Sequence, residues 1–168
     1  MQEAKKKYID LFQQMSDLCT AEGWGDPHSY ARSKEILAAC HLGHEVSGTL
    51  SGADAFNEKG HPVEYKSTTG AKVKGSYTGI SVQPSWEEQV KYLREDKILK
   101  YSEHYFNRFE GGELAESWVL TGQQVYDILL PKLRGKYSDV LYKKDPRLSA
   151  TVTTTEIKKL GKRAWSKG

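Results

Sequence analysis

Near the start of the chain, hydrophobic residues recur with the period of an α-helix. Between residues 4 and 18 they return every three or four positions, which predicts an amphipathic helix. The glycines and proline of residues 23–27 break this pattern. A second helix is expected over residues 29–41, with Tyr30 on its apolar face and Gly43 as its end.

The middle of the chain instead favours strands. Residues 49–56 and 62–68 are β-prone, and the polar, glycine-containing stretch 57–60 between them is typical of a hairpin loop. A further strand is predicted over 76–82 and a short helix over 86–93.

The C-terminal half contains both predicted strands and a predicted helix. Strands 105–109 and 114–120 flank a second hairpin signal at 110–113, and Thr121 is expected to cap a helix running to Leu133 that Pro131 kinks or ends. Residues 149–155 are a last β-prone run before a basic tail. The order of elements indicates a mixed α+β or α/β domain.

Composition narrows the class of protein. The 168 residues, 38% hydrophobic and 28% charged, suit a single domain over residues 1–168, and the aromatic content argues against disorder. No apolar run is long enough to span a membrane, and no secretory signal follows Met1, so we expect a cytoplasmic protein. Two cysteines are too few for a disulfide scaffold.

Charge is unevenly distributed along the chain. Residues 132–168 hold 11 basic and three acidic side chains, which leaves 14 basic and 19 acidic ones for the rest. A basic C-terminal region joined to an acidic body suggests a polyanionic partner such as nucleic acid. A solvated surface explains the same charges equally well.

One group of acidic and basic residues suggests a catalytic site. In a strand over 62–68, Glu64 and Lys66 share a face, while Val63 and Tyr65 face the core. A hairpin of this length brings Asp54 across from Glu64.

Two carboxylates and an ammonium suit a hard divalent cation. We expect Asp54, Glu64 and the main-chain carbonyl of Tyr65 to bind Mg²⁺, with Mn²⁺ as a substitute. Lys66 would position or help to deprotonate an attacking water, or stabilise developing charge. Phosphodiester hydrolysis is the reaction this grouping predicts.

The string Asp54-Ala55, followed ten residues later by Glu64-Tyr65-Lys66-Ser67, resembles the PD-(D/E)xK nuclease signature. It is most similar to small type II restriction endonucleases of the PvuII kind, although Ala53 stands where the signature has proline. The resemblance covers residues 52–67. It implies a restriction-endonuclease-like fold with a central, mixed, twisted sheet flanked by helices, and the catalytic residues Asp54, Glu64 and Lys66.

The resemblance also implies further site residues and partners. Glu35 is a candidate extra acid, although a solvent-exposed helical glutamate is the simpler interpretation. Candidate DNA-binding side chains, which could equally form a polar surface, are Lys72, Lys74, Tyr77, Thr78, Ser81 and Gln83. The basic charge of their region, and not the resemblance, adds Lys143 and Lys144, which could equally belong to a solvated tail. The helix within residues 1–20 is a candidate dimerisation element and residues 132–168 a candidate DNA-contacting region.

These observations predict a Mg²⁺-dependent, homodimeric endonuclease that cleaves double-stranded DNA at a specific site, with a methyltransferase acting on the same site as its partner. Two alternatives stay open. A homing, repair or junction-resolving nuclease would use the same core on other DNA substrates. A non-catalytic DNA-binding protein would carry Glu64 and Lys66 only as a surface ion pair.

Overall fold

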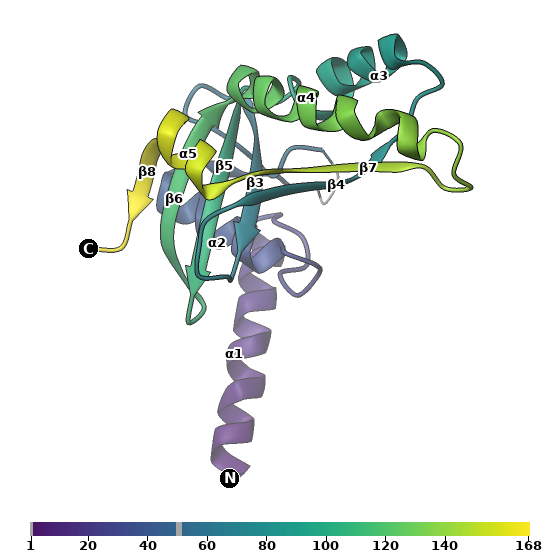
Figure 1. Ribbon diagram of the computed structural model, residues 1–168. Helices are drawn as coiled ribbons and strands as arrows, with labels where there is room; N and C mark the ends of the chain where they lie inside the picture. Colours follow the sequence, from purple (N-terminus) through teal and green to yellow (C-terminus); the bar gives the residue numbers. More distant parts are fainter. Residues whose placement is uncertain (1, 50–51) are drawn as a thin grey trace.

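A mixed β-sheet with helices on both faces forms the body of the protein, as the computed structural model of residues 2–49 and 52–168 shows (Figure 1). These described residues form five α-helices and a short π-helical turn. They are α1 (Gln2–Ala21), α2 (Arg32–Leu42), α3 (Trp86–Tyr92), η1 (Leu93–Lys97), α4 (Gly122–Val140) and α5 (Thr154–Leu160).

The strands of the described residues divide between two sheets. Six of them form the main sheet in the order β1-β2-β3-β5-β6-β8, with β3 and β5 parallel and all other neighbours antiparallel. The antiparallel pair β4 and β7 forms the second sheet. The strands are β1 (Glu45–Val46), β2 (Ala55–Phe56), β3 (Pro62–Thr68), β4 (Gly75–Ser81), β5 (Glu103–Glu110), β6 (Glu113–Thr121), β7 (Arg147–Val152) and β8 (Lys162–Ser166). The mixed α+β class expected from the sequence is confirmed.

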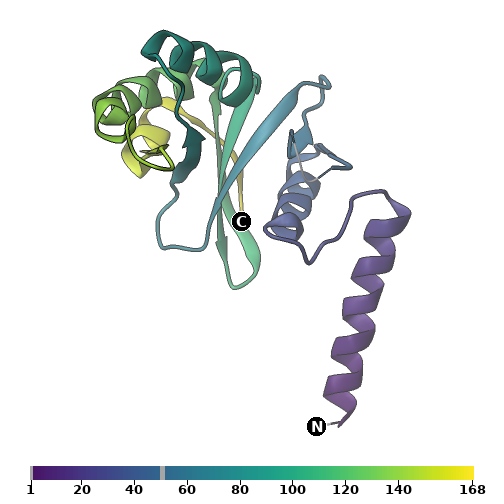
Figure 2. The same ribbon diagram turned by 90° about the vertical axis from the view of Figure 1, so that its right-hand side faces the viewer.

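Each face of the main sheet has its own hydrophobic core. On one face, Val63 and Tyr65 of β3 pack with Ala38 and Ala39 of α2. On the other, Phe106 of β5 belongs to a larger core that includes residues of α4, β4, β7 and α5. Figure 2 shows the sheet between α2 on one side and α3 and α4 on the other.

Most predicted elements lie close to their observed positions. Strand β3 has the predicted bounds, and Gly43 ends α2 with a left-handed φ of 69°. Thr121 caps α4 through a reciprocal pair of hydrogen bonds with Gln124.

Two predictions for the first half of the chain were wrong. Of the strand expected over 49–56, residues 50 and 51 lie outside the described residues and only Ala55–Phe56 is a strand, because the side chain of Ser47 bonds Thr49 in a turn and Gly52 has a φ of 102°. Tyr30 precedes α2 and is fully exposed, with a positive φ.

Two predictions for the C-terminal region were also wrong. Helix α4 continues past Pro131 to Val140, because its buried Leu133 and Tyr137 pack against the larger core beyond that point. The expected basic tail instead contains α5 and β8, and α5 is capped by Thr153 and Glu156.

Helix α1 projects away from the body of the protein (Figures 1 and 2). It has one buried residue, Cys19, and a stripe of exposed apolar side chains. The exposed side chains are Tyr8, Ile9, Leu11, Phe12, Met15 and Leu18. None of the helices in the described residues is both long and apolar enough to cross a membrane.

Candidate active site

Asp54 is held by its backbone between two neighbouring segments. Its N–H donates to the carbonyl of Val63 at 3.2 Å, and its own carbonyl accepts from the N–H of Ser47 at 3.3 Å. Since Ala55 pairs with Val63, the same register places Asp54 opposite Glu64. The hairpin therefore brings together the two acids that the sequence singled out.

The Asp54 side chain folds onto β3. Its Oδ2 accepts a hydrogen bond of 2.6 Å from the backbone N–H of Tyr65. Burial and the negative charge of Glu64 raise the pKa of Asp54 to about 7, although the bond from Tyr65 and the charge of Lys66 act in the opposite direction. A cation bound nearby would therefore stabilise the deprotonated form of Asp54.

Glu64 and Lys66 share one face of β3, as predicted, and Val63 and Tyr65 are buried on the other. The ammonium of Lys66 forms an ion pair with the Glu64 carboxylate. Both side chains are partly buried, with 17% exposure for Glu64 and 23% for Lys66. The pair is thus shielded from solvent more than an ordinary surface ion pair.

These two side chains line a hollow of about 170 Å³. Lys97, Lys100 and Tyr101 form part of its wall. The Tyr101 hydroxyl donates to the carbonyl of Gly52 at 2.8 Å, and the pKa of Tyr101 is raised by its burial and by the charge of Glu64. Tyr101 therefore bridges the segment before Asp54 and the Glu64 carboxylate.

The donor set suits Mg²⁺ better than a softer metal. Asp54 and Glu64 supply carboxylate oxygens, and Mg²⁺ keeps several waters besides one or two carboxylates. In a strand, the N–H and C=O of one residue point to the same edge, so the Tyr65 carbonyl faces the edge on which its N–H bonds Asp54. Among residues 2–49 and 52–168, no three His, Cys, Asp or Glu side chains gather into a metal-binding group, so the carbonyl and waters would complete the coordination.

Glu35 lies within electrostatic range of this site. It belongs to α2, and its charge contributes to the raised pKa of Asp54. Its carboxylate accepts from the guanidinium of Arg32 at 3.2 Å. Arg32 is buried and also donates to the carbonyls of Trp24 and Ser47, so it anchors α2 to the segment that leads to Asp54.

The candidate DNA-binding residues differ in their exposure to solvent. Lys72, Lys74 and Thr78 are exposed in β4 and the loop before it, and Thr78 lines the same hollow as Glu64 and Lys66. The placement of Tyr77 does not support its predicted role in binding DNA, because the side chain is 7% exposed and its hydroxyl is hydrogen-bonded to His104.

The remaining candidates lie at the end of β4 and beyond. Ser81 accepts a hydrogen bond from Arg147 at 2.8 Å. The backbone of Gln83 is fixed by the side chain of Gln89 and by the hydroxyl of Tyr137.

Basic side chains of residues 132–168 do not form one patch. Lys143 and Lys144 are exposed in the turn between α4 and β7, whereas the other basic cluster belongs to α5 and β8. Strand β7 separates that turn from α5, and the two regions lie at opposite ends of the body (Figure 1). A polyanion that met both regions would have to extend along the length of β7.

The sequence did not single out four residues around the acid pair: Lys97, Lys100, Tyr101 and His104. They come from η1, the turn after it and β5. Parallel pairing of β3 with β5 places His104 beside Glu64. No local pattern signals this pairing, because parallel strands are joined by long connections whose register depends on tertiary packing.

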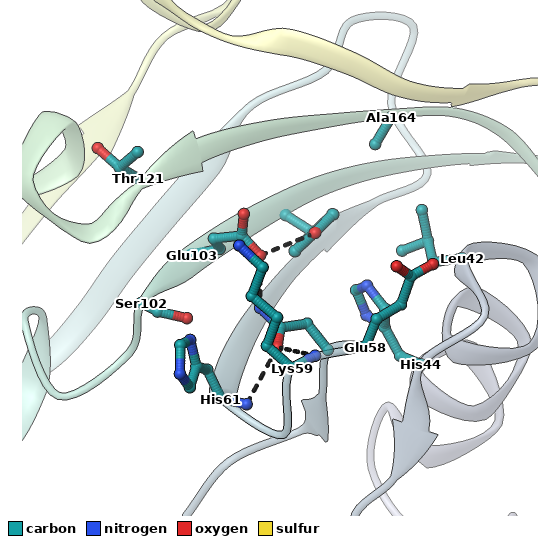
Figure 3. A pocket seen from close by; sticks show the side chains of 11 residues that line it. Leu42, His44, Glu58, Lys59, His61, Ser102, Glu103, Thr121 and Ala164 are labelled. Atoms are coloured by element: carbon teal, nitrogen blue, oxygen red, sulfur yellow. Dashed lines mark hydrogen bonds between the residues drawn. The ribbon is translucent and has the colours of Figure 1, made fainter.

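A larger hollow of about 420 Å³ is lined by residues of the β2–β3 hairpin and by His44 and Glu103 (Figure 3). Several of its polar groups already bond neighbouring side chains. Glu103 accepts from Asn57 at 3.0 Å and from the Tyr105 hydroxyl at 3.1 Å, and His44 is 2.7 Å from the Tyr65 hydroxyl. Its size alone therefore does not make it the centre of the chemistry.

Comparison with known proteins assigns no function to the site. No family model matches the chain, and no curated protein matches it.

Proposed function

We propose that this protein is a Mg²⁺-dependent endonuclease that hydrolyses phosphodiester bonds of double-stranded DNA at a specific site. The observation that carries the proposal is the hairpin register, which sets Asp54 opposite Glu64 while Lys66 is ion-paired beside them. The likeness of these residues to the PD-(D/E)xK signature supports the reaction type and a restriction-endonuclease-like fold.

Each residue of the site would have its own role in hydrolysis. Asp54, Glu64 and the carbonyl of Tyr65 would hold Mg²⁺, which when bound lowers the pKa of water and offsets charge on the reacting phosphate. The bond from the Tyr65 N–H fixes the orientation of the Asp54 carboxylate. Lys66 places a positive charge where the attacking water and the phosphate would meet.

DNA would reach the acids across the rim of the smaller hollow. Lys97 and Lys100 are exposed there and suit phosphate oxygens. Thr78 also lines the hollow, exposed Lys72 and Lys74 remain candidates for phosphate contacts, and Ser81 and Gln83 remain candidates for base contacts. The region 132–168 would contribute phosphate contacts from two separate basic clusters, one in the turn after α4 and one in α5 and β8.

A homodimer would match a palindromic target with two active sites. Helix α1 supports this part of the proposal, because its apolar stripe is exposed to solvent. A restriction enzyme of this kind would work alongside a methyltransferase that protects the same DNA site.

Cleavage of supercoiled plasmid DNA in Mg²⁺ or Mn²⁺ tests the proposal. We expect cutting by the unmodified protein, no cutting in EDTA, and loss of cutting in Asp54→Ala and Glu64→Gln. Glu58→Gln is the matched control, since Glu58 is exposed on the same hairpin. Undiminished cutting by Asp54→Ala would overturn the assignment of the site.

The form of the products separates the alternatives. Discrete fragments from a sequenced genome favour a site-specific restriction enzyme, whereas cutting confined to branched or long asymmetric substrates favours a junction-resolving, repair or homing nuclease. DNA binding without cleavage, and without carboxylate-dependent heat of metal binding, would indicate a non-catalytic DNA-binding protein.

A further inference from the structure

Tyr77 lies directly beneath the amine of Lys66. The ring belongs to β4, is 7% exposed, and has its centroid 4.9 Å from the Lys66 Nζ. An ammonium over an aromatic face is attracted by the negative potential of the ring, and the attraction strengthens when both groups are shielded from water.

A fixed hydrogen-bond chain holds this ring in place. The Tyr77 hydroxyl is 2.8 Å from Nδ1 of His104, and Nε2 of His104 is 3.0 Å from the carbonyl oxygen of Ile98. A carbonyl only accepts, so Nε2 carries the proton and donates, which leaves Nδ1 to accept from the Tyr77 hydroxyl. Burial lowers the pKa of His104 to about 4, which is consistent with this neutral ring.

Lys66 therefore has two partners of different kinds. One is the Glu64 carboxylate and the other is the Tyr77 ring. A divalent cation on Glu64 would compete with the ammonium for the carboxylate and repel it. The ring has no carboxylate oxygen for which the cation competes, so its attraction for the ammonium persists.

We propose that Tyr77 is a positioning residue for Lys66: fixed by His104 and the Ile98 carbonyl, it retains the amine at the site when a cation takes the Glu64 carboxylate. This role rests on the proposed function, because it assigns Glu64 to a metal. It also accounts for a polar chain built inside the hydrophobic core next to the site, where an unpaired polar group would be costly.

The placement of Lys66 can be tested by NMR without any DNA. In protein with isotopically labelled lysine, the ε-CH₂ protons of Lys66, assigned through Lys66→Arg, should show an upfield ring-current shift and an NOE to the Tyr77 ring. Both should persist in saturating Ca²⁺, in the unmodified protein and in Tyr77→Phe. The upfield shift should disappear in Tyr77→Leu and remain in Tyr137→Leu, a matched control whose tyrosine is equally buried elsewhere in the same core.

Cleavage kinetics supply the second readout. Tyr77→Leu should lower kcat roughly tenfold with little change in KM, and Tyr77→Phe should recover part of the loss, because it restores the ring face but not the bond to His104. A fall that Tyr77→Phe does not recover, or one shared by Tyr137→Leu, would overturn the positioning role in favour of general packing.

The two proposals fail in different ways. Absence of cleavage by the unmodified protein contradicts the nuclease and leaves the NMR comparison to decide the role of Tyr77. Loss of the Lys66–Tyr77 NOE on adding Ca²⁺ overturns the positioning role even in an active nuclease. That measurement needs no substitution at Tyr77, so it remains decisive if Tyr77→Leu does not fold.

Discussion

Replacing Asp54 with asparagine should stabilise the metal-free protein at neutral pH. The pKa of Asp54 is raised from 3.8 to about 7, so between these values the folded protein holds a proton that the unfolded chain has released. The raised pKa is therefore destabilising: its cost is absent below 3.8, grows as the pH rises, and is complete above about 7. At 1.36 kcal/mol per pKa unit, the full cost is about 4 kcal/mol.

Urea denaturation followed by tryptophan fluorescence, in EDTA and from pH 5 to pH 8, measures this cost. Asparagine keeps an oxygen that accepts from the Tyr65 N–H but carries no charge. The free energy of unfolding of Asp54→Asn should therefore exceed that of the unmodified protein by about 4 kcal/mol at pH 8, with the difference shrinking by about 3 kcal/mol at pH 5. Asp127→Asn, at an exposed position on α4, is the matched control and should show no such trend.

Adding a divalent cation should narrow this difference in the free energy of unfolding. A ligand at 100 times its Kd stabilises the folded state by about 2.7 kcal/mol, and Asp54→Asn should lose most of that gain. The reasoning is refuted if Asp54→Asn is less stable than the unmodified protein at pH 8 in EDTA. It is also refuted if the difference does not change with pH.

Three other predictions concern DNA contact, assembly and packing. Lys97→Ala and Lys100→Ala should each reduce the slope of log K against log salt for duplex DNA by about 1, measured by fluorescence anisotropy; unchanged slopes would remove these lysines from the DNA surface. Leu11→Glu on α1 should convert a dimer to a monomer in sedimentation equilibrium, and an unchanged mass would place the dimer interface elsewhere. Gly75→Ala should lower the free energy of unfolding by about 1–3 kcal/mol, because its Cβ would lie 2.2 Å from the Phe106 ring; unaltered urea stability would contradict the packing of β4 on β5.

Local sequence patterns were sufficient for most elements of this fold. Strand β3 alternates partly exposed and buried residues from Pro62 to Lys66, and α4 begins at a capping threonine, so each follows from short-range chemistry. The Thr153–Glu156 spacing is also a capping signal, and it could have identified α5 within the basic tail. Pro131 misled the prediction because burial of the second half of α4 outweighs the lost hydrogen bond.

The candidate site was only partly predictable for a similar reason. Asp54, Glu64 and Lys66 lie on one hairpin, where distance along the chain limits distance in space. His104 and Tyr77 reach Lys66 through the parallel β3–β5 pairing and the packing of a second sheet on the first, both set by the core as a whole. A sequence pattern alone therefore assigned Tyr77 to a DNA surface when the fold buries it.

The most direct measurement is a crystal structure with Mn²⁺, in which anomalous scattering locates the metal. We predict a peak about 2.0–2.2 Å from oxygens of Asp54 and Glu64 and from the carbonyl of Tyr65, and no peak there in Asp54→Asn. A metal bound elsewhere, or Asp54 and Glu64 left unliganded in saturating Mn²⁺, would contradict the metal site and the nuclease mechanism built on it.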